Sequence, residues 1–361
     1  MRFLFVAPRY HTNQVPIIEG LVEQGHEVLF LSHFRGGVED YSCIEPIIIG
    51  YSLFSPKHIK IGFPPIIALY KTFKSINPDV AILRERSVYT IFAYQICRLL
   101  KIPAILYNQS PLWEDEIKND LAHRLVRRLI PANRITPVLG FPGPGKVSEP
   151  GARFVPFVMP PMIAPERKKY SDDGTLRIFT IGKYEKRKNH LMLIEIIANL
   201  MNDKTYQLHL TISGDCSTDA HIHFYKKVED YVITNQLNDK VLLLKNLNRK
   251  EVFKIYEKVD LFIIPSTDEP ASISQLEAMA HSLPVICSDA NGTACYIEDG
   301  INGFIFADND KKALNEVINK ICDNTKLIPE MGRASYEIIE SKCNLINYLK
   351  SILEIYHKMV C

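Results

Sequence analysis

Two carboxylates with seven residues between them, Glu269 and Glu277, have the types and spacing best suited to chemistry in this chain of 361 residues. They lie where a predicted strand over 261–265 passes through a loop into a predicted helix. Carboxylates accept hydrogen bonds from vicinal hydroxyl groups, and the free N–H groups of a helix's first turn attract a diphosphate. This segment therefore predicts a nucleotide-sugar site that holds ribose, diphosphate and sugar together.

Basic residues after an earlier predicted strand supply the positive charge that such a site needs. Gly182 and Lys183 end the run LRIFTIGK, and Lys188 follows six residues after the glycine. Fixed cations stabilise the negative charge that develops on a leaving diphosphate. We therefore expect Lys183 and Lys188 to act in catalysis together with Glu269. The cysteines and histidines show no metal-ligand spacing, so no metal cofactor is expected.

These residues resemble those of glycosyltransferase family four, the retaining GT-B-fold sugar transferases that are also described as glycosyl transferases group 1. The resemblance covers the C-terminal half well, including the runs at 278–280, 284–285 and 300–303, and the N-terminal half in outline. It implies that Glu277 binds the ribose hydroxyls and that Glu269 lies beside the donor sugar and its phosphate. It also implies that the basic pair binds the diphosphate.

The loop after the first glutamate departs from the family pattern. Family members commonly have Gly-Phe-Gly there, whereas this chain has Pro270, Ala271 and Ser272. Proline has no N–H, so the amides of Ala271, Ser272 and Ile273 remain to contact the donor. The donor-binding residues expected besides Glu277 are Ala271, Ser272, Ile273, Ser274, Gly182, Gly214, Asn246 and Leu247.

Two of these donor-binding positions keep alternative interpretations. Gly214 either lets the backbone approach the nucleotide or makes a plain turn. The backbone at Asn246 and Leu247 is expected to contact the base, and because backbone groups discriminate little, both uracil and guanine stay open.

Polar residues near predicted strand ends in the N-terminal half are expected to form the acceptor or sugar pocket. This set comprises Arg9, His11, Thr12, Asn13, Arg84, Asn108 and Gln109. A lone histidine such as His11 is more often a structural hydrogen-bonding group than a catalytic base. Asn108 and Gln109 stand where many family members have a histidine that touches the donor sugar, and Arg84 has the alternative of a surface ion pair.

Strand-like and helix-like segments alternate through both halves of the chain, as in RFLFVA, DVAIL and IPAILY and later in LRIFTIG, YQLHLTIS and DLFIIP. Such alternation is typical of parallel, doubly wound sheets. We therefore predict an α/β protein with two Rossmann-like domains that face a central cleft, the GT-B fold. Residues 1–160 are expected to bind the acceptor and residues 161–343 the donor, with a linker at 156–174. The amphipathic stretch at about 344–361 is expected to pack back on the first domain.

Composition is that of a globular protein, with 47% hydrophobic and 23% charged residues, and the length exceeds one typical core. No apolar run reaches the roughly 18 residues of a membrane span, and RFLFVA is too short for a signal peptide. The eight cysteines are scattered and are interpreted as reduced thiols. A cytoplasmic location is therefore expected.

Charge is divided unevenly, since residues 1–165 hold 18 Lys/Arg against 13 Asp/Glu while the whole chain is only +2. The basic, amphipathic stretch 122–130 either lies on an anionic membrane surface, as in a peripheral protein, or packs as an ordinary helix with solvated arginines. The charge excess is modest and no aromatic-basic array occurs, so no nucleic-acid partner is expected.

Together with the resemblance, these features predict a retaining transferase that moves a sugar from a UDP- or GDP-sugar to a saccharide or lipid-linked saccharide, in bacterial surface polysaccharide assembly. No carboxylate nucleophile is evident, so front-face substitution is expected. Two alternatives stay open. One is a GT-B epimerase that acts on the nucleotide sugar itself and needs no acceptor, and the other is a non-catalytic nucleotide-sugar binding module.

Overall fold

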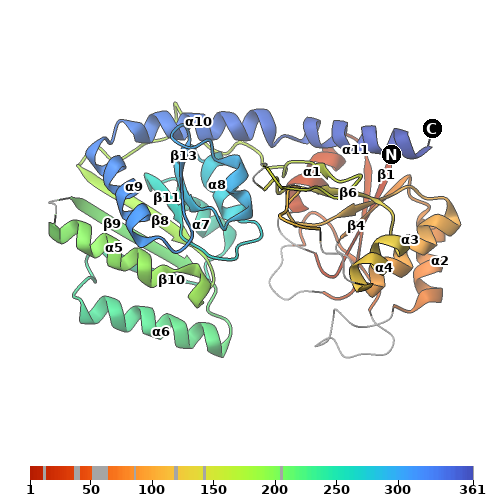
Figure 1. Cartoon of the computed structure of the whole chain (residues 1–361), viewed down its shortest axis with the longest axis horizontal. Coiled ribbons are helices and arrows are strands. Elements are labelled where there is room, and N and C mark those ends of the chain that lie inside the picture. Colours follow the sequence, from red (N-terminus) through yellow and green to blue (C-terminus); the bar gives the residue numbers. More distant parts are fainter. Residues whose placement is uncertain are drawn as a thin grey trace. The chain divides into compact units, whose positions relative to one another are not determined.

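The chain forms two compact units, one of Met1–Val158 with Cys343–Cys361 and the other of Met159–Lys342. The structure is a computed structural model, and it describes residues 1–10, 14–35, 41–50, 64–84, 87–117, 121–140, 144–203 and 206–360 (Figure 1). Each unit is a parallel sheet with helices packed on it.

The first unit contains a seven-stranded sheet in the order β3-β2-β1-β4-β5-β6-β7. Its strands are β1 (Arg2–Ala7), β2 (Glu27–Ser32), β3 (Ile47–Ile48), β4 (Val80–Arg84), β5 (Ala104–Tyr107), β6 (Asn133–Thr136) and β7 (Arg153–Phe154). All neighbouring pairs are parallel, and Val6 of β1 is in register with Leu31 of β2 and Leu83 of β4. Because both faces of the sheet are covered, its central strand is a continuous apolar run.

Alternate residues of β1 face different layers of helices, as the two-residue period of a strand requires. The helices of this unit are α1 (Val15–Glu23), α2 (Ile66–Ile76), α3 (Val88–Leu100), α4 (Leu121–Leu129) and α11 (Leu345–Val360). Phe3 and Phe5 pack with residues of α1 and α11, whereas Leu4 and Val6 pack with residues of α2 and α3. The C-terminal helix α11 is thus part of this unit's core.

The second unit repeats the arrangement with six parallel strands in the order β10-β9-β8-β11-β12-β13. Its strands are β8 (Thr175–Ile181), β9 (Gln207–Gly214), β10 (Val241–Lys245), β11 (Leu261–Ile264), β12 (Val285–Ser288) and β13 (Gly303–Phe306). Its helices are α5 (His190–Asp203), α6 (Asp219–Thr234), α7 (Arg249–Tyr256), α8 (Ile273–Ala280), α9 (Lys311–Asp323) and α10 (Leu327–Lys342), with the short helices η3 (Lys186–Lys188) and η4 (Gly292–Tyr296).

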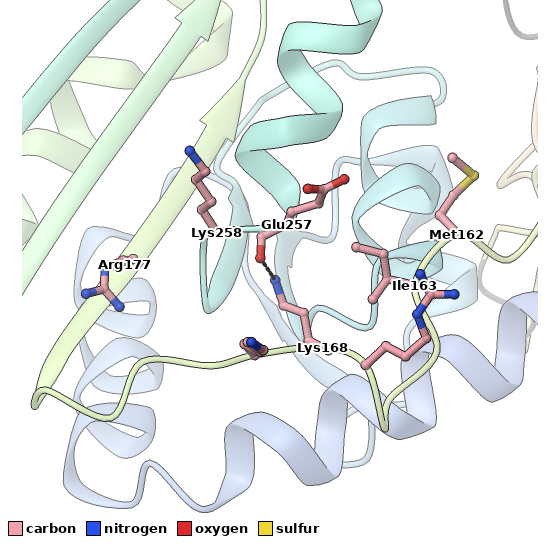
Figure 2. A pocket seen from close by; sticks show the side chains of 8 residues that line it. Met162, Ile163, Lys168, Arg177, Glu257 and Lys258 are labelled. Carbon is pink, nitrogen blue, oxygen red and sulfur yellow. Dashed lines mark hydrogen bonds between the residues drawn. The ribbon is translucent and has the colours of Figure 1, made fainter.

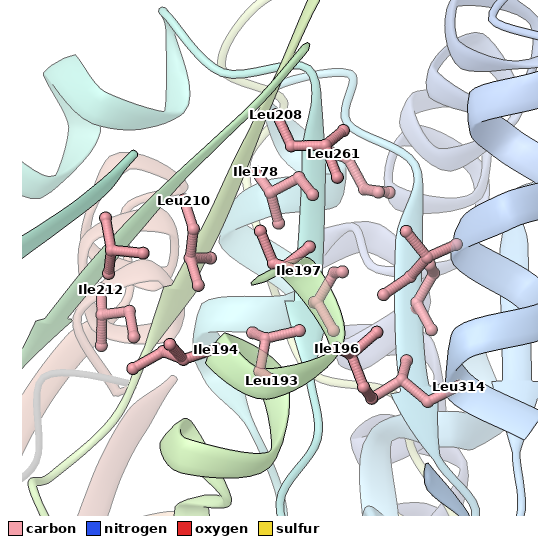
Figure 3. Close-up of a cluster of buried hydrophobic side chains, with 14 of the residues drawn as sticks. Ile178, Leu193, Ile194, Ile196, Ile197, Leu208, Leu210, Ile212, Leu261 and Leu314 are labelled. Carbon is pink, nitrogen blue, oxygen red and sulfur yellow. The ribbon is translucent and has the colours of Figure 1, made fainter. Parts of the chain in front are cut away.

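One face of the second sheet is covered by an aliphatic core. Figure 3 shows Leu193 and Ile197 of α5 beside strand residues such as Ile178 and Leu210. On β8 the next residue, Phe179, is instead in edge contact with Tyr256 of α7, at 5.3 Å between ring centroids. Consecutive residues of β8 therefore pack against helices on opposite faces of the sheet.

Candidate active site

The loops after β8 and β11 lie at the point where the strand order of the second sheet reverses. These two strands are neighbours, yet the chain leaves β8 toward β9 on one side and β11 toward β12 on the other. Ligands of open parallel sheets bind at the carboxyl ends of strands at such a point. The predicted residue Lys188 belongs to the loop after β8 (182–189), called the basic loop below. Glu269 belongs to the loop after β11 (265–272), called the glutamate loop.

Backbone and amide hydrogen bonds join the two loops to each other. The Thr267 N–H donates to the Arg187 carbonyl at 2.8 Å, and the Asn189 side chain donates to the Pro265 carbonyl at 2.8 Å. Asn189 also donates to the side-chain oxygen of Asn309 at 3.2 Å, and its φ of 52° is the left-handed conformation that ends the short helix η3. The basic loop is therefore held against the glutamate loop by its own backbone.

The Glu269 carboxylate is bound by two cations. Its Oε2 accepts hydrogen bonds from Arg187, at 2.9 Å, and from the Lys188 ammonium group. The Glu269 and Lys188 side chains are only 10% and 12% exposed, so solvent screens this contact weakly. The Arg187 Nε also lies 2.7 Å from the Glu185 carboxylate, so two cations meet two carboxylates here. A bound phosphate would compete with these carboxylates for the N–H groups of Arg187 and Lys188.

Gly182 is needed for the path of the Lys188 side chain. A Cβ atom added at Gly182 would lie 2.8 Å from the Lys188 Cδ, because the lysine chain crosses over the glycine. Lys183, which we expected to act in catalysis, is exposed, and among the described residues none forms a hydrogen bond or ion pair with its side chain. Arg187 occupies the position beside Glu269 instead, and the sequence signal for it was only its place within the basic run 183–188.

A buried network of hydrogen bonds among Gln275, Asn291 and Thr293 supports the glutamate loop. Asn291 donates to Gln275 at 2.7 Å, Gln275 donates to the Thr293 carbonyl at 2.8 Å, and all three residues are at most 2% exposed. Glu269 forms a parallel bridge with Asn291, so the network holds its backbone. The N–H of Ser272, one of the amides expected to meet the donor, donates to the Thr293 hydroxyl at 3.3 Å.

The N-terminus of α8 follows directly, with Ser272 as its N-cap residue. The Ser272 and Ser274 hydroxyls are 2.8 Å apart, and Ile273 and Ser274 form the first turn of the helix. Backbone N–H groups of a first turn have no acceptor within their own helix. The Ser272 amide is already bonded, so the amides of Ala271, Ile273 and Ser274 are those among the predicted donor contacts that remain for a ligand.

Glu277 lies one turn into α8 in a different environment from Glu269. Its side chain is 15% exposed, with the Arg249 Nε at 3.6 Å from Oε1. The Tyr256 hydroxyl donates to the Ser274 carbonyl at 3.0 Å and lies against the Glu277 carboxylate. Burial raises the pKa of Glu277 to about 7, while Arg249 and the Tyr256 hydroxyl act in the opposite direction.

Arg249 and Tyr256 were not predicted as site residues. Both belong to α7, whose start is marked by a capping box in which the Asn248 side chain accepts from the Glu251 N–H and Glu251 accepts from the Asn248 N–H. That capping box is visible in the sequence and locates the first residue of α7. It does not show that α7 packs beside α8.

Gly214 and Asn246 hold neighbouring strand ends together. A Cβ atom at Gly214 would lie 2.0 Å from the Gly182 carbonyl oxygen, so close packing between β9 and the loop after β8 already requires glycine there. Asn246 has a φ of 55°, and its side-chain oxygen accepts from the Cys216 N–H at 2.7 Å. Leu247 follows in the same loop, half-buried.

In the first unit, the predicted residues Arg9, Arg84, Asn108 and Gln109 lie at the carboxyl ends of the adjacent strands β1, β4 and β5. Arg84 is 8% exposed, with its guanidinium group 5.6 Å from the centre of the Tyr107 ring. Carboxyl ends of adjacent parallel strands meet at one sheet edge, so these residues gather at that edge. The predicted residues His11, Thr12 and Asn13 lie outside the described residues.

Arg134 organises the loop after β5 and was not predicted. It is 3% exposed and donates to the Asn108 side-chain oxygen at 3.0 Å and to the Ser110 carbonyl at 3.1 Å. Gln109 donates to the Tyr107 hydroxyl at 3.4 Å. The Asn108 oxygen is therefore already bonded within the protein, and its NH₂ group is the part suited to a ligand.

The stretch predicted as a basic amphipathic helix forms α4. Leu121 and Leu125 on this helix are 75% and 53% exposed. Among the helices that the structure describes, none combines the length and apolarity needed to cross a membrane.

Residues 163–338 match the protein family described as glycosyl transferases group 1. A capsular polysaccharide biosynthesis glycosyltransferase, CapM of Staphylococcus aureus, is 26% identical over 227 residues, which cover 63% of this chain and 56% of that protein. The UDP-Gal:alpha-D-GlcNAc-diphosphoundecaprenol alpha-1,3-galactosyltransferase of Escherichia coli is 26% identical over 189 residues, covering 51% and 46%. The chain spans about half the length of the curated relatives it matches.

Solved structures show the same fold over almost the whole chain. A glycosyltransferase from Rickettsia africae ESF-5 superposes with a TM-score of 0.76 at 16% identity, covering 99% of this chain and 98% of that one. Anabaena HepE in complex with UDP-glucose has a TM-score of 0.69 at 13% identity, covering 99% and 100%. The predicted fold class, two Rossmann-like parallel sheets of the GT-B type, is confirmed. The match to glycosyl transferases group 1 thus lies in residues 163–338, within the second unit, and the rest of the chain shares the fold of these solved structures.

Proposed function

We propose that this protein is a retaining glycosyltransferase that moves a sugar from a nucleotide-diphosphate sugar to a saccharide or lipid-linked saccharide. The observation that carries the proposal is the Glu269 carboxylate bound by Arg187 and Lys188 beside the N-terminus of α8. Cations, free amides and a carboxylate in one place suit a sugar diphosphate.

The cations would act on the leaving group. As the bond between the anomeric carbon and the phosphate oxygen breaks, negative charge develops on the diphosphate, and Lys188 and Arg187 stabilise it. In front-face substitution the acceptor oxygen forms the new bond on the same face of the sugar. Its proton passes to the departing phosphate oxygen, so the anomeric configuration is retained. Glu269 would orient the two cations and hydrogen-bond the donor sugar.

The second glutamate would select the nucleotide part of the donor. In its ionised form Glu277 accepts hydrogen bonds from two ribose hydroxyls. The names of relatives suggest where to begin, since the E. coli relative is described as using UDP-Gal and the Anabaena structure holds UDP-glucose. We propose a UDP-sugar as the first candidate donor and keep GDP-sugars as the second.

The acceptor would be a glycan under construction at a membrane. The S. aureus relative is described as acting in capsular polysaccharide biosynthesis, and the E. coli relative's name gives a diphosphoundecaprenol-linked acceptor. Arg9, Arg84, Asn108 and Gln109 of the first unit are the proposed acceptor or sugar contacts. A cytoplasmic, peripheral location is proposed accordingly.

The experiment is a donor panel followed by a transfer assay. Saturation-transfer NMR with UDP-, GDP- and ADP-sugars is expected to identify one donor whose signal is lost in Glu277→Ala. It should be kept in Glu316→Ala, which removes a glutamate that is 64% exposed on α9. Transfer to a diphosphoundecaprenol-linked saccharide, run with a chelator because no metal is expected, should then release the nucleoside diphosphate only when acceptor is present.

The same assay separates the two alternatives. An epimerase would convert the donor without any acceptor, and a binding module would bind the donor without turnover in either condition. If no donor binds, or Glu277→Ala binds as well as the unaltered protein, the proposed site is wrong.

Helix α4 provides a surface for the proposed membrane association. Its exposed leucines and arginines give an apolar stripe flanked by positive charge, which suits an anionic bilayer, each cation contributing about 1 kcal/mol. Sedimentation with phosphatidylglycerol vesicles is expected to exceed that with phosphatidylcholine vesicles. Leu121→Gln/Leu125→Gln should reduce it, whereas Leu99→Gln, at a position 71% exposed on α3, should not. Equal binding to both lipids would contradict this role.

A further inference from the structure

A basic pocket lies at the opposite edge of the second sheet from the site described above. Its volume is about 680 Å³, and it is lined by Met162, Ile163, Arg167, Lys168, Lys169, Arg177, Glu257 and Lys258 (Figure 2). Arg177 is near the start of β8, and Glu257 and Lys258 precede β11. The seven residues of β8 separate this edge from the Lys188 loop by about 20 Å.

The charges of the pocket are strongly unbalanced. Five of the eight lining residues are basic, and Glu257 is the one acidic residue among them. Arg177 is paired with Asp173 at 2.5 Å. Arg167, Lys169 and Lys258 are exposed, and none of the described residues forms an ion pair with them. Three cations are thus available to a ligand.

Lys168 is the buried member of the pocket lining, and the end of helix α7 holds its ammonium group. Lys168 is 7% exposed, and its ammonium group donates to the carbonyls of Tyr256 at 2.7 Å and Glu257 at 3.0 Å. These two bonds use two of its three N–H groups, and no other described residue accepts from the third. Burial lowers the pKa of Lys168 to about 8, so the charged form still predominates at pH 7.

Size and lining point to the class of ligand. The volume lies within the 300–1,000 Å³ range of small-molecule sites, larger than a single phosphate ion needs. Met162 and Ile163 add an apolar flank, with Met162 39% exposed. Arginine and lysine together suit phosphate oxygens. We propose that this pocket is a second, separate binding site for a small phosphate-bearing molecule, independent of the proposed transfer reaction.

The test follows the Met162 methyl group, which lines the pocket and reports on it locally. In protein labelled with ¹³C-methyl methionine, with the resonance assigned by Met162→Leu, pyrophosphate is added at constant ionic strength. A saturable shift is expected, and Arg167→Ala/Lys169→Ala/Lys258→Ala should weaken the affinity at least tenfold. The control Lys226→Ala/Lys227→Ala/Lys312→Ala removes three exposed lysines from α6 and α9 and should retain the affinity.

Two further variants separate this site from other phosphate sites. Lys188→Ala is expected to leave the Met162 shift unchanged, and loss of the shift there would assign it to the donor site and overturn the proposal. The proposal also fails if the Met162 methyl resonance does not shift even at high pyrophosphate concentrations. It fails as well if both triple variants lose affinity for pyrophosphate equally. A vesicle experiment separates a soluble ligand from a lipid headgroup. If the pocket triple variant no longer sediments with phosphatidylglycerol vesicles while Leu121→Gln/Leu125→Gln still does, the pocket binds a lipid headgroup and the proposal of a small soluble ligand is wrong.

Discussion

The two glutamates of the motif differ in what surrounds their carboxylates. Glu269 touches two cations, whereas Glu277 is buried beside a tyrosine hydroxyl with its nearest guanidinium nitrogen at 3.6 Å. A carboxyl group that is withdrawn from solvent without a close cation is easier to protonate than one in water. The raised pKa of Glu277 therefore makes the charge of this carboxyl group depend on pH near neutrality.

Donor binding is expected to weaken as pH falls through about 7. The raised pKa of Glu277 means that its carboxyl becomes protonated there and loses the charge that attracts ribose hydroxyls. Nucleotide-sugar diphosphates do not titrate in this range, so the Kd of a UDP-sugar measured by calorimetry at pH 8 and pH 6 isolates the protein group. The Kd should rise by up to about tenfold, since one unit of pKa corresponds to a factor of ten.

Glu277→Gln is the matched control for this pH effect. The variant should bind more weakly at pH 8 and show a flat profile, because the amide does not titrate. A flat profile in the unaltered protein would show that Glu277 is not the group that binds the ribose.

Gly182→Ala should impair turnover by moving Lys188. The new methyl group would lie 2.8 Å from the Lys188 side chain, which is flexible and can shift without unfolding the protein. We expect kcat to fall by about 10–100-fold, as for a misplaced catalytic group, with little change in thermal midpoint. Gly182→Ala/Lys188→Ala should be no slower than Lys188→Ala alone, and additive losses in this double-mutant cycle would contradict the mechanism.

At the scale of elements, the site depends on how two loops are joined across adjacent strands. Thr267 and Asn189 connect the basic loop to the glutamate loop, and the network of Gln275, Asn291 and Thr293 supports the latter. Each contact links segments far apart in sequence, such as 189 and 265. Loss of one contact should therefore loosen the geometry at Glu269 without removing any group that touches the ligand.

Asn189 offers a test, because its conformation and its side chain can be changed separately. Asn189→Ala loses two hydrogen bonds and places alanine at a φ of 52°, so the free energy of unfolding should fall by about 1–3 kcal/mol. Asn189→Gly loses the same bonds but suits the backbone and should be destabilised by less. Chemical denaturation measures the difference.

Both Asn189 variants should lower kcat, since both release the loop that carries Lys188. An unchanged kcat in Asn189→Gly would show that the amide contact stabilises the fold without positioning the lysine.

At the scale of the whole molecule, each unit contains a buried histidine that is held neutral. Burial lowers the pKa of His33 in the first unit and of His190 in the second to about 3. His190 directly follows the basic loop, and the charge of Lys188 adds to the effect. Both units therefore contain a histidine whose protonation is opposed by burial, His33 just after β2 and His190 at the start of α5.

Acid should destabilise both units through these histidines. A lowered pKa gives stability that is fully present above the unfolded value of 6.5 and is lost as pH falls toward about 3. Each proton taken up on unfolding contributes a slope of about 1.4 kcal/mol per pH unit. Denaturation between pH 6.5 and 4.5 should show this slope, reduced in His33→Phe and in His190→Phe. It should be unchanged in His357→Gln, at an exposed position on α11.

Local patterns in the sequence were sufficient for the fold class and for the positions of the two glutamates. Alternating apolar strands and amphipathic helices require parallel doubly wound sheets, and the placement of Glu269 and Glu277 follows from the strand-loop-helix pattern around them. The short strands β6 and β7 were not predicted, because their residues, NRIT and RF, contain no apolar run like that of β5 or β11.

Only the tertiary structure decided which groups meet at the site. Arg187 rather than Lys183 reaches Glu269 across 82 positions, Arg249 and Tyr256 approach Glu277 from α7, and Gly214 is required by the Gly182 carbonyl. The basic pocket likewise combines a segment before β8 with the turn after α7. Parallel pairing brings the ends of strands that are distant in sequence side by side. The spacing of residues along the chain does not determine which of their side chains then come into contact.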